Sequence, residues 1–493
     1  MTNRDRSPGL QRRAFLGGVT SAGLASAGLA SAGLASAGLA SAGVGSVLTP
    51  RAALSQTSAQ RVAPTMASAP PSAVLARTTE HLVGSTVNHA YAVKAGPFVF
   101  LNGHEGYDFE AGVTPAVAGA PGFPEYGKPG LRREAEYILE RMGHILKSFG
   151  TDFAHCVRLD QYFTEANAVR AYHLARFAAF GKYIPPSTSM ITEGCFGGKS
   201  RMTNSLVAVL PDPQWEVNPV YPKDAAFFAY SGYAPAVTVN DFVFAAGAGP
   251  DAKDVISTDA PAGPHYLWST QLPIRRQAES ALKKIESTLN AAGTSLANCI
   301  KAHVHIAGAE NFPDFLDVWN AHAGNSPAAL TVTPTKGFSA VEIILSINYI
   351  LLKDGARRKK EIVRSDIPET ASYSPAVRAG EFVFSPGLLP MTREGAVAGL
   401  LQGDHFPGLC LRSQLQANTI YDHAEAIAKA AGTDMRNVVR ANYWVSDIRE
   451  FPGVAMAWAG RYGNAPHPFT CVVTPKLPAP GATVMADFWF YAG

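Results

Sequence analysis

The sequence predicts an α+β protein in which one unit is repeated three times, so that a single chain builds a pseudo-trimer. The chain has 493 residues, which corresponds to about three domains at roughly 150 residues per domain. The same succession of strand and helix signals occurs three times. A Gly-Thr pair ends one helix of each copy, and its glycines, Gly150, Gly293 and Gly432, are 143 and 139 residues apart. Such a near-constant offset indicates internal repeats.

Each copy opens with an apolar strand that ends at a glycine and leads into a loop rich in Pro and Gly. These strands are residues 98–103, 242–247 and 382–387. A helix follows, and in the second copy its apolar residues Ala281, Leu282, Ile285 and Leu289 have helical spacing. The Gly-Thr pair after the helix suits a left-handed cap.

A middle strand, a second helix and two late strands complete the copy. The middle strands are residues 156–159, 299–302 and 438–441; a proline leads into the late strands at 186–192, 327–333 and 468–474; the last strands are 206–210, 343–351 and 484–491. The unit therefore reads β-(β)-α-β-α-β-β, with helices on one face of a mainly antiparallel sheet. We expect the other face to be buried against the other two copies, so that three sheets close a central barrel around a pseudo-threefold axis.

The middle strands carry polar or aromatic residues at alternate positions. These residues are Arg158, Asp160 and Tyr162; Lys301, His303 and His305; and Arg440, Asn442 and Trp444. Alternation places each set on one face of its strand, and the apolar Leu159, Ala302 and Ala441 on the helix-covered face. The polar sets could form an anion site through Arg158, Lys301 or Arg440. They could equally be polar packing between repeats, with ion pairs such as Arg158 to Asp160.

The N-terminus is predicted to be a targeting segment rather than part of the fold. Arg12-Arg13 is followed by a Gly- and Ala-rich, uncharged run over residues 21–47, which resembles a twin-arginine (Tat) export signal. Its many glycines make a stable membrane helix poor, although an uncleaved anchor is the alternative. We predict a signal peptide over residues 1–50 and a linker over 51–84. Recognition by the Tat machinery would take the protein to the periplasm or the medium.

Composition excludes several classes of function. A net charge of +3, with 16% charged residues and no basic stripe, gives no support for nucleic-acid binding. Five cysteines without a CxxC pair argue against a disulfide framework or a zinc site. The pair His303 and His305 has the spacing of two metal ligands on a strand, but no third ligand is evident and no metal is predicted. No Gly-rich phosphate loop or nucleophile elbow is present.

The repeat motifs resemble the Rid family of reactive-intermediate (enamine/imine) deaminases. The resemblance is carried by Gly-x-x-Val-Phe-x-x-Gly at residues 96–103 and 380–387, and by Ala-Ala-Gly-Thr at 291–294. It covers three repeats, which we place at residues 85–212, 226–353 and 372–493. It implies a chorismate-mutase-like fold, a trimeric barrel, and small-molecule sites in the clefts between units. It also implies hydrolysis of imines or enamines without metal or cofactor, while some family members only bind small molecules.

Two family positions are then transferred to this chain. An Arg two residues after the proline of the late strand grips the substrate carboxylate in enamine-deaminating members, and a bidentate Arg suits that task. The matching positions here are Thr188, Ala329 and Thr470, none of which is Arg. The family also has an acid on the last strand that orients water, and our alignment matches it with Asn204, Glu342 and Asp487.

The first repeat differs most from the others, because His104-Glu105 follows Gly103 directly and Tyr107 is close behind. A carboxylate beside a histidine can act as general base or acid on water, although a solvated loop is the alternative. We therefore predict two sets of site residues. The catalytic candidates are Glu342, Asp487 and Glu105; the substrate-binding candidates are His104, Tyr107, Arg158, Lys301, Arg440, Thr188, Thr470 and Asn204.

Two functions remain open at this point. The first is a cofactor-free hydrolase or lyase for an imine, an enamine or a related unsaturated acid, with sites in the inter-repeat clefts. The second is an exported binding protein whose Rid-like sites are degenerate, which the missing Arg favours. In either case we expect a monomeric pseudotrimer or a dimer of such monomers.

Overall fold

The computed structural model describes residues 75–82, 87–108, 112–122, 127–223, 232–249, 273–323, 327–340, 342–368, 374–399 and 411–493. The predicted signal over residues 1–50 lies outside the described residues, as does most of the predicted linker. Met66–Gly493 form one compact unit. None of the helices among the described residues has the length and apolar character that a membrane crossing requires.

Three sheets share one strand order. In the first sheet this order is β1 (Ala76–His81), β2 (Asn88–Ala95), β3 (Phe98–Glu105), β9 (Met202–Val209), β6 (Cys156–Phe163) and β7 (Ser187–Ile191). In the second it is β10 (Asn218–Val220), β11 (Ala236–Val239), β12 (Phe242–Ala248), β15 (Leu345–Leu352), β13 (Cys299–Ala307) and β14 (Ala329–Thr335). In the third it is β16 (Lys360–Val363), β17 (Ala376–Ala379), β18 (Phe382–Phe384), β21 (Val484–Tyr491), β19 (Val438–Val445) and β20 (Phe469–Val473), with β8 (Gly194–Cys195) beyond β20.

The strand order fits tandem repeats, with two differences from the expected architecture. Each sheet has an edge strand, β1, β10 or β16, that begins before the repeat boundary placed from the sequence. The described strands also pair into separate open sheets, and none of these sheets closes on itself as a hydrogen-bonded barrel. The reason is that the units meet mainly through side chains and isolated backbone contacts. Among the described strands, the ladder that crosses between units is the short pairing of β8 of unit one with β20 of unit three. A small sheet of β4 (Tyr107–Asp108) and β5 (Gly112–Val113) stands apart.

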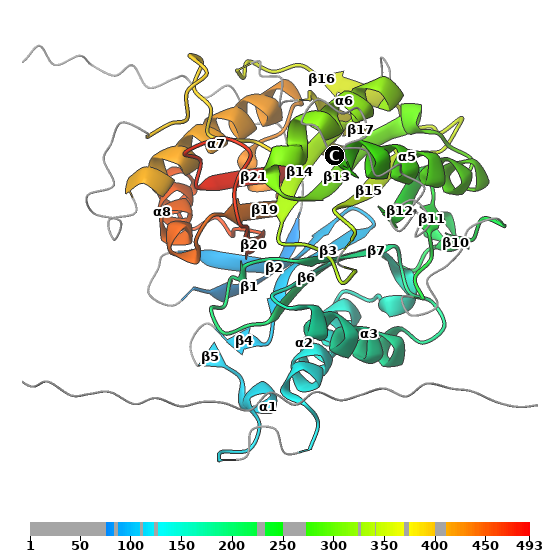
Figure 1. The fold of residues 1–493 in the computed structure, drawn as a ribbon, viewed down its shortest axis with the longest axis vertical. Helices are drawn as coiled ribbons and strands as arrows, with labels where there is room; N and C mark the ends of the chain where they lie inside the picture. The colour runs from blue at the N-terminus through cyan, green and yellow to red at the C-terminus, as the bar shows by residue number, and fades with distance from the viewer. Residues whose placement is uncertain are drawn as a thin grey trace, which may run out of the picture. The chain divides into compact units, whose positions relative to one another are not determined.

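A pair of helices packs on one face of each sheet (Figure 1). The pairs are α2 (Gly130–Ser148) with α3 (Ala166–Phe180), α5 (Pro273–Ala291) with α6 (Phe312–Ala323), and α7 (Leu411–Ala430) with α8 (Phe451–Tyr462); the short α1 (Pro115–Ala118) lies against α2. Three apolar cores lie between the helices and the sheets, and Leu159, Ala302 and Ala441 each belong to one of them. This confirms the expected helix-covered face of the middle strands.

The Gly-Thr pairs end α2, α5 and α7 in the same way. Gly150, Gly293 and Gly432 have φ of 78°, 69° and 74°, the left-handed conformation that favours glycine. The threonine hydroxyls then donate to carbonyls of the last strands: Thr151 to Val209 at 2.6 Å, Thr294 to Leu352 at 2.5 Å and Thr433 to Tyr491 at 2.8 Å. The motif that revealed the repeats therefore fastens each first helix to its sheet.

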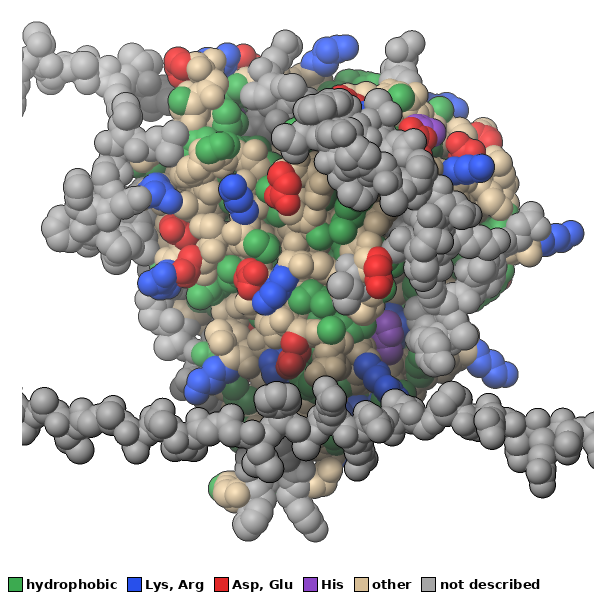
Figure 2. Space-filling model, in the orientation of Figure 1, with side chains coloured by type: hydrophobic (Ala, Val, Ile, Leu, Met, Phe, Trp, Pro, Cys, Tyr) green, Lys and Arg blue, Asp and Glu red, His purple; other side chains and the backbone are tan. Residues whose placement is uncertain are grey.

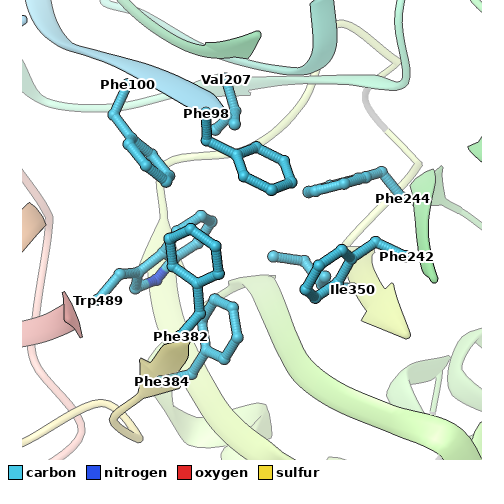
Figure 3. Close-up of a pocket in the computed structure, with 9 residues that line it drawn as sticks. All are labelled: Phe98, Phe100, Val207, Phe242, Phe244, Ile350, Phe382, Phe384 and Trp489. Carbon is cyan, nitrogen blue, oxygen red and sulfur yellow. The ribbon is translucent and has the colours of Figure 1, made fainter. Parts of the chain in front are cut away.

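The faces away from the helices meet in a core of aromatic rings (Figure 3). The two phenylalanines of each opening strand lie here, from Phe98-x-Phe100, Phe242-x-Phe244 and Phe382-x-Phe384, together with Trp489. The ring centres of Phe98, Phe242 and Phe382 are 5.2 to 6.3 Å from one another. The first phenylalanine of each opening strand thus meets its two equivalents from the other units. The empty space between the rings is only about 10 Å³.

Backbone contacts also join the units in a cycle. His467 accepts from Ala90, which joins unit three to unit one, and Leu330 accepts from Gly387, which joins unit two to unit three. Ile191 donates to Gly337, which joins unit one to unit two. Each late parallel strand therefore lies near the opening strands or loops of another unit. On the face shown in Figure 2, acidic and basic side chains are interspersed rather than gathered by sign.

Candidate functional site

The alternating residues of the middle strands face one another across the units, as predicted. Register shows which residues are equivalent: Arg158 pairs with Val207, Lys301 with Ile350 and Arg440 with Trp489. These cations therefore occupy the same position in each unit. Asp160, His303 and Asn442 form the next layer, and Tyr162, His305 and Trp444 form the one after that.

The first two layers form a buried ionic cluster. Arg158 donates to Asp160 at 3.0 Å, and Arg440 from the third unit donates to the same carboxylate at 2.6 Å. Lys301 of the second unit lies 2.8 Å from Asp487 of the third, which also accepts from Asn442 at 2.6 Å. The five charged side chains are at most 4% exposed. Pairing with carboxylates fits the interpretation as polar packing between repeats. The gathering of several cations in one place fits the interpretation as an anion site.

Burial and charge shift the pKa values within the ionic cluster. Burial alone raises the pKa of Asp160, but the guanidinium groups of Arg158 and Arg440 outweigh it and hold that pKa at about 2. Burial lowers the pKa of Lys301, and its contact with Asp487 offsets only part of that shift. Asp160 is therefore a permanent carboxylate between two arginines and not a proton carrier.

The third layer is less charged. Thr333 lies 2.7 Å from Nδ1 of His305 and 3.3 Å from Nε2 of His303. Burial lowers the pKa of His305 to about 3, so its imidazole is neutral at physiological pH. Among the described residues no third His, Cys, Asp or Glu joins these histidines as a metal ligand.

Register corrects the alignment of the last strands. Asp487 pairs with Asn442, and the equivalent pairs are Asp160 with Ser205 and His303 with Asn348. Ser205 and Asn348 therefore replace the expected Asn204 and Glu342. Motif counting misses them because each unit has a different loop before its last strand, and a slip of one residue moves a side chain to the other face of a sheet.

The two displaced candidates lie elsewhere. Asn204 pairs with Gln161, is fully buried, and points to the face that Arg176 of α3 covers through its bond to Gln161. Glu342 is exposed on the loop before β15, and its carbonyl accepts from Gln277. Neither meets Asp487.

The clefts at the late strands differ in how tightly they close. Thr470 of the third unit bonds to Ser205 at 2.7 Å, just as the equivalent Thr188 bonds to Asn348, but a Cβ on Gly103 would also lie 2.9 Å from the carbonyl oxygen of Phe469. In the second unit the register makes Thr331, not the expected Ala329, equivalent to Thr188 and Thr470, because Thr331 pairs with His303. Gly387 donates to the carbonyl of Leu330, the residue before Thr331. Close contact between backbones thus leaves no space for a ligand beside the late strands of the second and third units.

The late strand of the first unit, in contrast, borders a cavity of about 920 Å³ between units one and two. Its walls come from α3, from β7, and from the segment before β15. The described lining residues are Ala166, Asn167, Val169, Arg170, His173, Leu174, Phe177, Ser187, Thr188, Ser189, Tyr233, Gly249, Phe338, Ser339, Ala340, Ile343 and Ser346. The volume lies within the range of small-molecule sites. Of the predicted residues, Thr188 lines it, and Glu342 lies in sequence between lining residues Ala340 and Ile343.

The polar groups of this cavity are mostly hydroxyls. The Oγ of Ser189 lies 3.4 Å from Nε2 of His173, and the hydroxyl of Thr188 donates to the side-chain carbonyl of Asn348. Burial, with a smaller effect of Arg176, lowers the pKa of His173 to about 3. Arg170 is exposed, and the described lining contains no carboxylate. The sequence offered no signal for His173 or Ser189, because neither belongs to a repeated motif.

The predicted His104, Glu105 and Tyr107 come together around a second, much smaller space near the contact of units one and three. Glu80, His89, Tyr91, Gly103 and Arg141 complete its wall, and it has about 10 Å³ of room, enough for about one water. Glu105 accepts from the amides of Phe196 at 3.0 Å and Gly197 at 2.7 Å. Burial raises the pKa of Glu105 to about 8. The hydrogen bond from Gly197 acts in the opposite direction, but its effect is smaller. Glu105 is therefore protonated at neutral pH.

The four described cysteines are buried and free. Burial raises the pKa of Cys195 and of Cys471 well above the ordinary value, with a smaller contribution from Glu105. Such thiols are poor nucleophiles.

Comparison with known proteins supports the resemblance in part of the chain. Residues 223–343 and 364–485, which make up most of the second and third units, match the family model described as endoribonuclease L-PSP. Two RutC family proteins are similar over 106 residues: one from Pyrococcus horikoshii at 24% identity and one from Pyrococcus abyssi at 23%. Each match covers 22% of this chain and 76% of the relative.

Solved structures of single-unit proteins are similar as well. Yeast Mmf1 is 24% identical with a TM-score of 0.23, and 28% of this chain covers 99% of it. A probable translation initiation inhibitor from Rhodopseudomonas palustris is 26% identical with a TM-score of 0.24, and 27% of this chain covers 98% of it. At the family level, the match to the family model and to the RutC family proteins relates duplicated domains of this chain to the Rid proteins.

Proposed function

We propose that this protein is an exported Rid-like hydrolase that works in the cavity between units one and two. The observation that carries the proposal is the 920 Å³ cavity beside Thr188, where the late strand of unit one meets unit two. The equivalent positions of the other two late strands are closed by backbone contacts. One cleft of three is then the working site.

The lining of the cavity suggests the kind of substrate. Phe177, Tyr233 and Phe338 offer apolar and aromatic walls, whereas serines and Thr188 offer hydroxyls. No buried cation lines the described part of the cavity, so nothing there would grip a carboxylate deeply. The substrate is an imine or enamine that is neutral, or that carries its negative charge at the rim near Arg170.

The proposed reaction is the addition of one water to a carbon–nitrogen double bond. Water attacks the imine carbon, and the tetrahedral product breaks its carbon–nitrogen bond to release a carbonyl compound and ammonia or an amine. An enamine reacts after protonation at carbon has made it an imine. His173 and Ser189 would hold the attacking water, because the neutral imidazole and the hydroxyl can each accept a hydrogen bond. Such positioning is the main contribution, since an imidazole with a pKa of about 3 is a weak base.

Binding without turnover is the second candidate function. It is favoured by the lack of a carboxylate among the described lining residues and by the low basicity of His173. Of the three predicted catalytic acids, only Glu342 is on a segment that borders the cavity. Asp487 is bound to Lys301, and Glu105 is enclosed near unit three.

The two candidates are separated by assaying the purified chain with imines generated in the reaction mixture. We expect carbonyl release above the spontaneous rate, and a loss of about 10- to 100-fold in kcat/KM for His173→Ala with Ser189→Ala. Glu342→Ala tests the predicted acid, and Glu136→Ala, on the outer surface of α2, is the control. Saturable binding with spontaneous rates throughout would establish the binding protein instead.

Export and assembly are part of the same proposal. Arg12-Arg13 and the uncharged run after them support recognition by the Tat machinery and a periplasmic or secreted location. The cyclic backbone contacts and the meeting of Phe98, Phe242 and Phe382 support a pseudotrimer that is complete in one chain. Fusion of residues 1–60 to a reporter exported only by Tat, with Arg12→Lys and Arg13→Lys as the control, tests the location.

A further inference from the structure

The ionic cluster carries one positive charge that its own side chains do not neutralise. Arg158 and Arg440 share the single carboxylate of Asp160, while Lys301 pairs with Asp487. Arginine keeps its proton in proteins. Lys301 and Asp487 add no net charge whether the proton is on the amine or on the carboxyl. The sum over the cluster is therefore +1 in either state.

Several hydrogen-bond donors around this charge have no partner among the described residues. They are Nη1 and Nη2 of Arg158, Nη1 of Arg440, Nε1 of Trp489 and the hydroxyl of Tyr162. Arg158 is 4% exposed, and the other three residues are at most 2% exposed. Buried donors without an acceptor are costly and rare, and here several occur together.

Two of these side chains lie against the same indole ring. The guanidinium carbons of Arg158 and Arg440 lie 5.4 Å and 4.9 Å from the centre of the Trp489 ring, whose nitrogen is visible in Figure 3. Both guanidinium groups also reach Asp160, the neighbour of Tyr162 two positions along β6. Arg158 and Tyr162 come from unit one, and Arg440 and Trp489 from unit three. The unpaired donors thus lie where these two units meet.

We propose that Arg158, Arg440 and Trp489 bind one monovalent, halide-sized anion in the interior of the protein. A single negative charge brings the cluster to neutrality, whereas a divalent anion would leave a buried negative charge. A halide accepts hydrogen bonds from several directions, as the scattered donors require. The burial of every donor excludes a large metabolite. This site is separate from the cavity beside Thr188 and does not depend on the proposed hydrolase activity.

The direct test is to refold and crystallise the full chain in bromide and to collect diffraction data at the bromine absorption edge. Refolding is needed because a buried ion exchanges slowly. We expect one anomalous peak within hydrogen-bonding distance of Nη atoms of both Arg158 and Arg440. Ordered side chains without an anomalous peak there, or with water density only, would overturn the proposal.

A solution test uses thermal unfolding at constant ionic strength while bromide replaces fluoride, which is more strongly hydrated. A ligand that binds only the folded state raises Tm with its concentration. We expect Tm of the wild type to rise and Tm of Arg440→Met to be independent of bromide, because that variant loses the excess charge. An equal rise in both proteins would contradict the site.

Arg358→Met is the matched control. Arg358 is also stacked on aromatic rings, Trp215 and Phe242, but its guanidinium is paired with Asp241 and Glu381. We expect this variant to keep the bromide response. Should Arg440→Met fail to fold, the diffraction experiment on the wild type still decides the question.

Discussion

Arg440 of the third unit donates to Asp160 of the first across 2.6 Å, although the two residues are 280 positions apart in the chain. Asp160 also accepts from Arg158 of its own unit, so one carboxylate joins two middle strands. The two arginines favour the ionised form of this carboxyl and hold its pKa at about 2. The contact between units one and three therefore depends on charge as well as on apolar packing.

Asp160→Asn should lower the free energy of unfolding by about 3–5 kcal/mol, because it leaves two buried guanidinium groups without their carboxylate partner. Asp314→Asn, which breaks an ion pair at the surface, should cost about 1 kcal/mol or less. Urea unfolding at neutral pH measures both. Equal costs would show that the buried pair is dispensable.

The carboxylate of Asp160 should also make the stability of the folded state depend on pH in the acid range. A depressed pKa stabilises the folded state above the ordinary value of 3.8, and this stabilisation is lost as pH falls towards 2. We expect roughly 2 kcal/mol of acid-dependent stability from Asp160. Unfolding curves between pH 5 and 2 should lose that component in Asp160→Asn, and an unchanged slope would contradict the assignment.

Glu105 should have the opposite dependence. Its folded pKa of about 8 lies above the ordinary value of 4.5, so the folded state holds a proton that the unfolded state has released. Stability should therefore fall as pH rises from about 4.5 to 8, by a few kcal/mol at most. Glu105→Gln should remove this decline. Glu136→Gln, which changes a partly exposed carboxylate paired with Lys128 and Arg132, should keep it. A decline that persists in Glu105→Gln would exclude Glu105 as its source.

Gly103→Ala should be more destabilising than Gly150→Ala. Both glycines have positive φ, which costs an alanine about 1 kcal/mol. A Cβ on Gly103 would also lie 2.9 Å from the carbonyl oxygen of Phe469, whereas nothing lies within 4 Å of one on Gly150. Thermal unfolding should show a larger fall in Tm for Gly103→Ala, and similar falls would mean that units one and three do not meet this closely.

Ala340→Trp should block the cavity with little effect on the fold, because Ala340 is an exposed lining residue. We expect a large loss of substrate binding with Tm nearly unchanged. Ala179→Trp, at an exposed position of α3 outside the described lining, should bind normally. Normal binding by Ala340→Trp would move the working site elsewhere.

The assembly can be checked by light scattering. We expect the mass of one chain, or of two if the monomers pair. The reason is that Phe98, Phe242 and Phe382 already pack against one another within one chain. A stable homotrimer would contradict this packing.

The sequence determined the repeat itself and the sidedness of its strands. Gly150, Gly293 and Gly432 are needed for a left-handed backbone after a helix, and alternation around Arg158, Lys301 and Arg440 separates an apolar face from a polar one. These are local requirements, so each appears in the order of the residues.

The tertiary structure decided which residues of the three units are equivalent and which unit borders the cavity. Asn348 and Ser205, not Glu342 and Asn204, are equivalent to Asp487, because sheet register depends on loops of different lengths that no motif records. His173 and Ser189 share a cavity because α3 packs beside β7, a contact between segments that carry no common pattern. Pairing between distant strands, and the space left where two backbones fail to meet, are properties of the folded chain alone.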